Sequence, residues 1–137
     1  MTQKYLNELT RDIIGAAIEV HKELGPGLLE SIYEKCLAHL LKGKGFYVIT
    51  HQRVPVLFKR LQLDCDLRFD LMVENAIIVE AKAIDSLLPI HEAQLLTYLK
   101  LMSKPKGILH NFNCTNIYKE GQRTMVTELF ASLPKGY

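Results

Sequence analysis

Apolar residues in three stretches of the chain recur at steps of three and four, which is the period of an amphipathic helix. The first stretch ends at Gly25-Pro26-Gly27, because glycine tolerates a left-handed backbone and proline cannot continue a helix. Asp85 or Ser86 is placed to cap the third. The pattern predicts helices from about Gln3 to Leu24, from Leu28 or Leu29 to about Lys44, and from about Leu88 to Met102.

Elsewhere the chain has short runs rich in β-branched and aromatic residues, which are typical of strands. From Leu61 to Val73 polar and apolar residues alternate, so one face of that strand is polar and carries Asp70. Ile77-Ile78-Val79 shows no alternation, as expected of a strand covered on both sides. The other predicted strands are Phe46–Thr50, Val54–Phe58, Ile108–Phe112 and Thr124–Phe130.

The buried run leads directly into Glu80-Ala81-Lys82. Charges in a dry interior lose several kcal/mol of hydration unless a partner or a metal ion compensates, so this strand needs one. We favour a metal ion over the alternative, which is a buried salt-bridge network of Asp70, Glu80, Lys82 and Arg68.

The register of the hairpin decides whether Asp70 can reach Glu80, because a one-residue slip turns a side chain to the other face. A two-residue loop at Glu74-Asn75 would place Asp70 opposite Val79. A three-residue loop, Glu74 to Ala76, would place it opposite Glu80. We predict the three-residue loop.

Both flanking helices contribute polar candidates. Glu30 falls within the apolar face of the second helix, near Tyr33, and is aimed partly inward; the alternative is a first-turn Glu stabilised by the helix dipole. Gln94 lies on the same side of the third helix as Tyr98, and buried amides need partners. The alternative is that both are merely packed against the sheet.

Composition narrows the class of protein only slightly. With 137 residues, 48% of them hydrophobic, the chain is expected to form one domain over residues 1–137. A net charge of +2 does not by itself indicate a nucleic-acid-binding protein. Three cysteines without C-x-x-C spacing argue against disulfides or structural zinc and fit a reducing cytoplasm. Without a signal peptide or an apolar run of about 20 residues, we expect a soluble, unprocessed, cytoplasmic protein with no membrane partner.

The segment from Gly27 to Tyr33 has the form G-x-x-E-x-x-Y. Together with Asp70, Glu80-Ala81-Lys82 and the pair Gln94 and Tyr98 it resembles the GxxExxY proteins, which are assigned to the PD-(D/E)XK nuclease superfamily. A [DE]-x-K triplet alone arises by chance roughly once in a chain this long, so the combination carries the resemblance. The superfamily's proline is absent before Asp70, where Phe69 stands.

The resemblance implies a catalytic set of Asp70, Glu80, Lys82 and Glu30. Asp70 and Glu80 would be ligands of Mg²⁺ or Mn²⁺, which suit hard carboxylate oxygens, and Glu30 would complete the metal-binding cluster directly or through a metal-bound water. Lys82 would orient or deprotonate the attacking water and offset charge on the phosphate. Gln94, Tyr98 and Tyr33 are the expected substrate-binding residues.

The resemblance also implies an α/β (α+β) fold with a restriction-endonuclease-like core. The expected order is α-α-β-β-β-α-β-β around a mixed central sheet flanked by helices. The implied function is metal-dependent hydrolysis of phosphodiester bonds in nucleic acid, with DNA favoured over RNA, and a homodimer is one way to complete the substrate surface. The alternative is a catalytically silent module that binds nucleic acid or protein and retains the nuclease fold.

Overall fold

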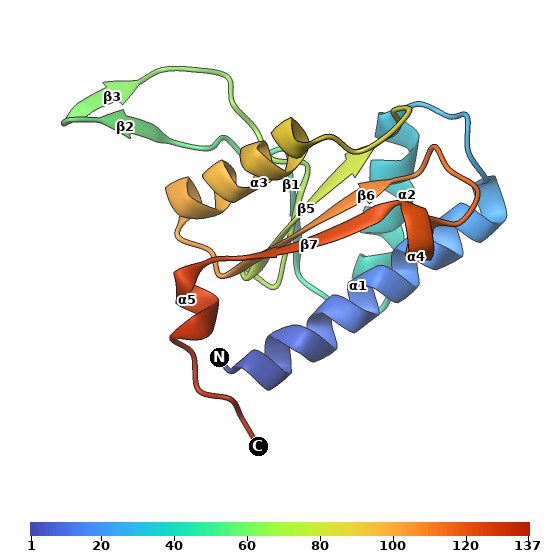
Figure 1. The fold of residues 1–137 in the computed structure, drawn as a ribbon, viewed down its shortest axis with the longest axis horizontal. Helices are drawn as coiled ribbons and strands as arrows, with labels where there is room; N and C mark the ends of the chain where they lie inside the picture. The colour runs from blue at the N-terminus through green and yellow to red at the C-terminus, as the bar shows by residue number, and fades with distance from the viewer.

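The computed structural model describes residues 1–137, and Figure 1 shows a central sheet crossed by helices. The helices are α1 (Gln3–Leu24), α2 (Glu30–Gly43), α3 (Pro89–Met102), α4 (Ile117–Glu120) and α5 (Glu128–Ala131). The strands are β1 (Val48–Thr50), β2 (Val56–Phe58), β3 (Leu61–Leu63), β4 (Leu71–Val73), β5 (Ile77–Lys82), β6 (Lys106–Asn111) and β7 (Gln122–Val126).

Five strands form the central sheet in the order β1-β4-β5-β6-β7, and only the pair β5 and β6 is parallel. The chain crosses between these two strands through α3, as a parallel connection requires. Every residue of β6 is buried, and so are all residues of β5 except Lys82. Glu80 therefore lies in the best-shielded part of the sheet, and Lys82 is partly exposed at the end of β5.

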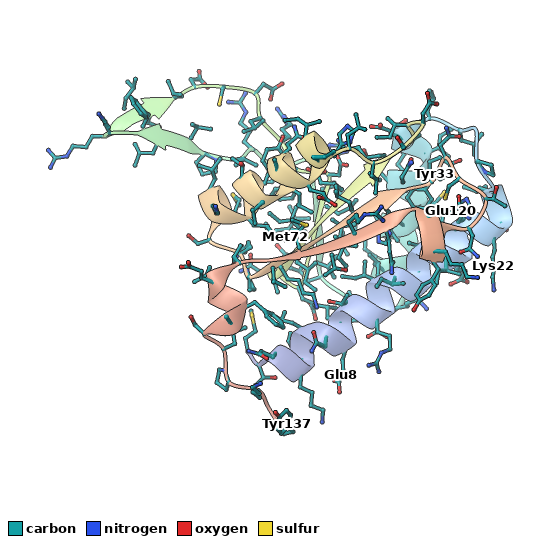
Figure 2. All side chains as sticks on the ribbon, in the orientation of Figure 1. Glu8, Lys22, Tyr33, Met72, Glu120 and Tyr137 are labelled. Atoms are coloured by element: carbon teal, nitrogen blue, oxygen red, sulfur yellow. The ribbon has the colours of Figure 1, made fainter.

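The sheet separates two apolar cores. Ile77, Val79 and Ala81 of β5 pack with α1 and α2, while Ile78 packs with α3 on the other face. This alternation follows from the period of two along a strand. Figure 2 shows Tyr33 and Met72 inside the fold, and both are fully or almost fully buried.

Three strands of the sheet, β1, β4 and β5, precede α3, and β6 and β7 follow it, so the sheet and the three long helices keep the predicted order. β2 lies within the predicted strand Val54–Phe58 and β3 at the start of the predicted run from Leu61, but the two form a separate hairpin outside the central sheet. The short helices α4 and α5 are additional elements. The predicted cap of α3 is wrong. The helix begins at Pro89, and His91 Nδ1 accepts the backbone N–H of Leu88.

Two predicted strands have the wrong extent. The run from Leu61 to Val73 is not one strand, because residues 64–70 between β3 and β4 are irregular apart from a single bridge at Arg68. The run from Thr124 to Phe130 is split, since β7 ends at Val126 and α5 starts at Glu128. Alternating polarity continues from Leu61 through residues 64–70, so the sequence pattern gave no sign of the first break, whereas the segment from Thr124 to Phe130 has no alternation that marks it as one strand.

The β4–β5 hairpin has the predicted three-residue loop. Val73 pairs with Ile77, and the intervening Glu74 and Asn75 have positive φ angles of 54° and 53°. Extending the observed register by one residue sets Asp70 opposite Glu80. No helix of the protein has both the length and the apolar character needed to cross a membrane.

His110 on β6 is buried without a hydrogen-bond partner at either ring nitrogen. It lies near Phe112 and across from Ala81 of β5. Burial disfavours the charged imidazolium and lowers the pKa of His110 from 6.5 to about 4. The unfolded chain therefore binds a proton between these pH values that the folded protein does not.

Replacing His110 with Leu should make the stability less sensitive to acid. In the native protein the free energy of unfolding falls as the pH drops from 6.5 to 4, by up to about 3 kcal/mol from this group. The variant lacks this loss, so its advantage over the native protein should grow toward pH 4 in urea titrations. The control His39→Leu changes an exposed imidazole and should follow the native pH dependence. Parallel curves for His110→Leu and the native protein would contradict the prediction.

Candidate metal centre and active site

Asp70 and Glu80 meet at the open end of the β4–β5 hairpin. The backbone N–H of Asp70 donates to Glu80 Oε2 at 3.1 Å, and the N–H of Ala81 donates to Asp70 Oδ2 at 2.9 Å. Each carboxylate thus accepts an amide proton from the opposite chain segment, which holds both side chains in place. The structure brings together the acidic pair that the loop length predicted.

Glu80 is the more deeply buried carboxylate of the pair. Only 4% of the residue is exposed. Burial, and then the adjacent Asp70 carboxylate, raise the pKa of Glu80 to about 9, against a weaker opposing effect of Lys82. Without a cation, the pair therefore retains a proton near neutral pH.

A second carboxylate, from Glu34 of α2, also reaches Asp70. Burial and then the charge of Asp70 raise the pKa of Glu34 to about 7, with a smaller contribution from Glu30 and an opposing one from Lys82. Glu34 Oε2 lies 2.9 Å from His51 Nε2. Oxygen or nitrogen atoms of Glu34, His51 and Asp70 all lie within 4.8 Å of one another, so the three side chains could share one cation.

Sequence reasoning did not find Glu34 or His51. Glu34 follows Glu30 by four residues, so both lie on one side of α2, and this spacing was an available signal. His51 follows β1, where its backbone N–H donates to the Asp70 carbonyl at 3.0 Å. That contact depends on the pairing of β1 with β4, which no local pattern reveals.

Glu30 occupies a different position from the one expected of a direct ligand. Its Oε1 accepts the backbone N–H of Ala83 at 3.3 Å, beside Lys82. Asn111 holds the next residue, because its side-chain amide both donates to the Ile84 carbonyl at 2.9 Å and accepts from the Ile84 N–H at 3.1 Å. These bonds fix the chain that follows β5. Lys82 is two residues from Glu80 and therefore shares its face of the strand.

Gln94 and Tyr98 lie together on α3. The Gln94 amide donates to the Tyr98 hydroxyl at 3.2 Å, and Tyr98 is 5% exposed whereas Gln94 is at the surface. Burial and then the charges of Glu80 and Asp70 raise the pKa of Tyr98. The Tyr98 hydroxyl on α3 thus lies close enough to Glu80 and Asp70 for their charges to affect its pKa.

Tyr33 lies at a buried position with both hydrogen bonds of its hydroxyl already used. The hydroxyl donates to the Gly25 carbonyl at 2.6 Å and accepts the Leu28 N–H at 3.1 Å. The ring is fully buried and stacks on Phe112, with 4.4 Å between ring centroids. These contacts fix the turn before α2 and give Tyr33 no surface toward a substrate.

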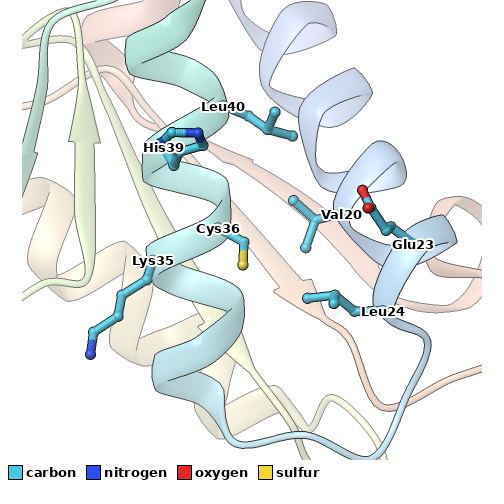
Figure 3. Close-up of a pocket in the computed structure, with 7 residues that line it drawn as sticks. All are labelled: Val20, Glu23, Leu24, Lys35, Cys36, His39 and Leu40. Atoms are coloured by element: carbon cyan, nitrogen blue, oxygen red, sulfur yellow. The ribbon is translucent and has the colours of Figure 1, made fainter.

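The acidic group opens into a surface hollow of about 320 Å³ lined by Glu34, His51, Lys35, His39 and Lys42, among others. A second groove, of about 330 Å³, runs between α1 and α2 and is lined by Val20, Leu24, Cys36 and Leu40 with three polar residues (Figure 3). None of the predicted site residues lines that groove. The hollow is lined by Glu34 and His51, two of the three possible ligands, whereas the groove is lined by none of them, so the hollow is the one related to the acidic centre.

The model of one protein family matches residues 7–124, and that family is described as the PD-(D/E)XK nuclease superfamily. The chain belongs to the PD-(D/E)XK nuclease superfamily. Its five-stranded mixed sheet with flanking helices is the restriction-endonuclease-like fold expected of a superfamily member. Searches of curated proteins and of solved structures found no match to the chain.

Membership in a nuclease superfamily implies a nucleic acid substrate and a divalent metal ion, and the residues present fit such an ion. Three potential ligand atoms converge within 4.8 Å, and two of them are carboxylate oxygens, which suit hard divalent cations. Burial and the negative charge of Asp70 raise the pKa values of Glu34 and Glu80, so ionising both carboxylates calls for compensating positive charge. A divalent cation would supply it.

Replacing Glu80 with Gln should raise the Tm of the cation-free protein at pH 8. The amide keeps an oxygen that can accept the Asp70 N–H and removes a charge that burial disfavours. Because the pKa is about 9 in the folded state and 4.5 in the reference state, this group's contribution to stability is lost as the pH rises through that range. The Tm difference between variant and native protein, measured with chelator present, should therefore grow from pH 5 to pH 9.

Addition of Mn²⁺ should reverse this loss in the native protein. The rise in Tm should be larger at pH 8 than at pH 6, since more of the ligands are ionised, and smaller in Glu80→Gln. Glu8→Gln removes an exposed carboxylate on α1 and should change neither response. A Glu80→Gln protein that keeps the native pH dependence and the native Mn²⁺ response would contradict the assignment.

Proposed function

We propose that this protein is a metal-dependent nuclease that hydrolyses phosphodiester bonds. The observation that carries the proposal is the paired Asp70 and Glu80, with Lys82 on the same face of β5, in a member of a nuclease superfamily. A structural salt-bridge network is a weaker explanation, because Glu80 makes no salt bridge and burial raises its pKa to about 9 despite the opposing effect of Lys82.

The metal ligands would come from both sides of the hairpin end. Asp70 is central, because it contacts Glu80 through the backbone and belongs to the group formed with Glu34 and His51. Glu80 is the second proposed ligand. Glu30, the third ligand expected from the sequence, would act through a bound water or by fixing the chain after Lys82. We propose Mg²⁺ or Mn²⁺ as the ion, because both suit the carboxylate oxygens of Asp70 and Glu80.

A bound divalent ion would polarise the phosphate and lower the pKa of a coordinated water. Lys82 would orient or deprotonate the attacking water and offset the negative charge on the phosphate oxygens. Gln94 and Tyr98 would hold the scissile phosphate or a nucleotide, which is supported by the effect of the Glu80 and Asp70 charges on the pKa of Tyr98 and by the hydrogen bond from Gln94 to the Tyr98 hydroxyl. Lys35 and Lys42, which line the adjacent hollow, would hold a neighbouring phosphate. Tyr33 would position α2 rather than contact the substrate.

We propose DNA as the preferred substrate over RNA. The test is to incubate the protein with single- and double-stranded DNA and RNA, in Mg²⁺, in Mn²⁺ or with chelator. Asp70→Asn and Lys82→Ala should each lower the cleavage rate by about 100-fold or more, since each removes a group that acts on the reacting water or phosphate. Chelator should abolish cleavage.

Matched control variants separate these roles from general effects of charge. Asp12→Asn and Lys100→Ala alter exposed residues of α1 and α3 and should cleave at the native rate. Cleavage that survives Asp70→Asn and Lys82→Ala, or that ignores chelator, would refute the proposed residues. Binding of nucleic acid without cleavage under any condition would instead favour a catalytically silent module with the nuclease fold.

A further inference from the structure

The β2–β3 arm, defined here as residues 52–68, projects from the body of the protein (Figure 1). The arm connects the end of β1 to the start of β4, so it continues from the paired ends of these two strands. Beyond the last residue pair of the β1–β4 ladder, the His51 N–H donates to the Asp70 carbonyl. The backbones of Arg53 and Arg68 then form an isolated antiparallel β-bridge, and the Val54 N–H donates to the Leu67 carbonyl at 2.7 Å. The arm is therefore rooted directly at the proposed metal centre.

The arm holds the whole positive charge excess of the chain. It contains four basic residues and two acidic ones, whereas the rest of the chain has thirteen of each. The acidic residues Asp64 and Asp66 already contact Arg53 and Arg68 at the base of the arm. Lys59 and Arg60 at the tip have no acidic partner within salt-bridge distance, so their charges are available to a polyanion.

The turn at the tip keeps these two basic residues despite a conformational cost. Phe58 pairs with Leu61, so Lys59 and Arg60 are the only loop residues, and both have positive φ angles, 45° and 71°. Two-residue turns with two positive φ angles prefer Asn-Gly, because side chains such as Lys and Arg disfavour this conformation. A basic pair at such a turn indicates a requirement other than folding.

One face of the ribbon is apolar and lacks a partner. Val56 and Leu63 form one cross-strand pair and Phe58 and Leu61 the next, so all four side chains share a face. Phe58 is 61% exposed and Leu61 57%. Lys59 Nζ lies 5.5 Å from the centroid of the Phe58 ring, which places a charge beside an aromatic surface.

We propose that the arm binds unpaired nucleotides of the substrate next to the bond that is cut. Bases would stack on the apolar face around Phe58, and their phosphates would contact Lys59 and Arg60. This face has no side-chain donors or acceptors, so it cannot read base-pair edges in a groove, whereas the faces of unstacked bases need only an apolar surface. A hollow of about 580 Å³ at the base of the arm, lined in part by Arg53 and Leu63, is large enough for a small-molecule-sized group such as a base. This inference rests on the proposed nuclease function.

The first test measures binding without cleavage. The probe is a fluorescein-labelled 20-nucleotide single strand, compared with the same sequence as a blunt duplex, with chelator present throughout. The double variant Lys59→Asn with Arg60→Gly installs the favoured turn sequence, so it should fold at least as well as the native protein. It should bind the single strand more weakly and lower the slope of log K against log salt by about 1.4, for two phosphate contacts. Lys22→Gln with Lys119→Gln removes two exposed charges from α1 and α4 and should leave the slope unchanged.

The second test compares the two faces of the same strand. Phe58→Ser should raise the Kd for the single strand by about tenfold, because it removes the proposed stacking surface. Leu57→Ser alters a side chain that is 65% exposed on the opposite face and should bind as the native protein does. Circular dichroism and Tm measurements on each variant check that the fold is retained.

Three results would overturn the inference. The first is native affinity in both arm variants. The second is tighter native binding to the blunt duplex than to the single strand. The third is a native dimer in sedimentation that Phe58→Ser dissociates, which would assign the apolar face to a second copy of the chain. None of these results depends on cleavage, so the native protein could still cleave nucleic acid if the inference about the arm failed. The nuclease proposal fails separately, if the native protein with Asp70, Glu80 and Lys82 intact does not cleave.

Discussion

The contact on which the rest of the site depends is the reciprocal one between Asp70 and Glu80. Each carboxylate accepts a backbone amide from the opposing segment, so the same bonds close the hairpin and bring two negative charges together. In a low-dielectric setting this arrangement needs a proton or a cation. Glu34 and His51 place ligand atoms within 4.8 Å of those of Asp70, and the positive charge of Lys82 lowers the pKa of Glu34 against the effect of burial.

The position of this contact in the fold explains how several layers reach it. β1 and β4 leave the sheet beside the carboxyl end of β5, so groups from α2, α3 and the β1–β4 ladder all converge there. Glu30 and Asn111 hold the chain that follows Lys82 from two further elements. Because the neighbouring strands are buried on both faces, the centre sits on a rigid support while the arm beside it extends into solvent.

Sequence could predict the long helices, because each buries one continuous apolar face whose period is visible in the chain. It could also predict that Asp70 meets Glu80, since that depends only on the length of one loop. The role of His51 depends on which distant strand lies beside β1, and no short pattern encodes that choice. Glu34 lies at the border between the apolar and polar sides of α2, where burial depends on the neighbouring elements. For Tyr33 the sequence indicated an important residue, but only the fold shows that its hydroxyl holds the turn at Gly25.

The three-residue loop has a consequence for how this chain can change over evolutionary time. All residues of β4 are buried and apolar, and the sheet has an apolar core on each side. Leu71, Met72 and Val73 could therefore pack with either side of the strand toward α1 and α2. The hydrophobic pattern therefore does not determine the register between β4 and β5. The number of residues between Val73 and Ile77 determines it. Substitutions at Glu74 or Asn75 would be tolerated where the backbone permits. Insertion or deletion of a single residue there would turn Asp70 away from Glu80 in a protein that still folds, so selection on activity should act on the length of this loop more than on its composition.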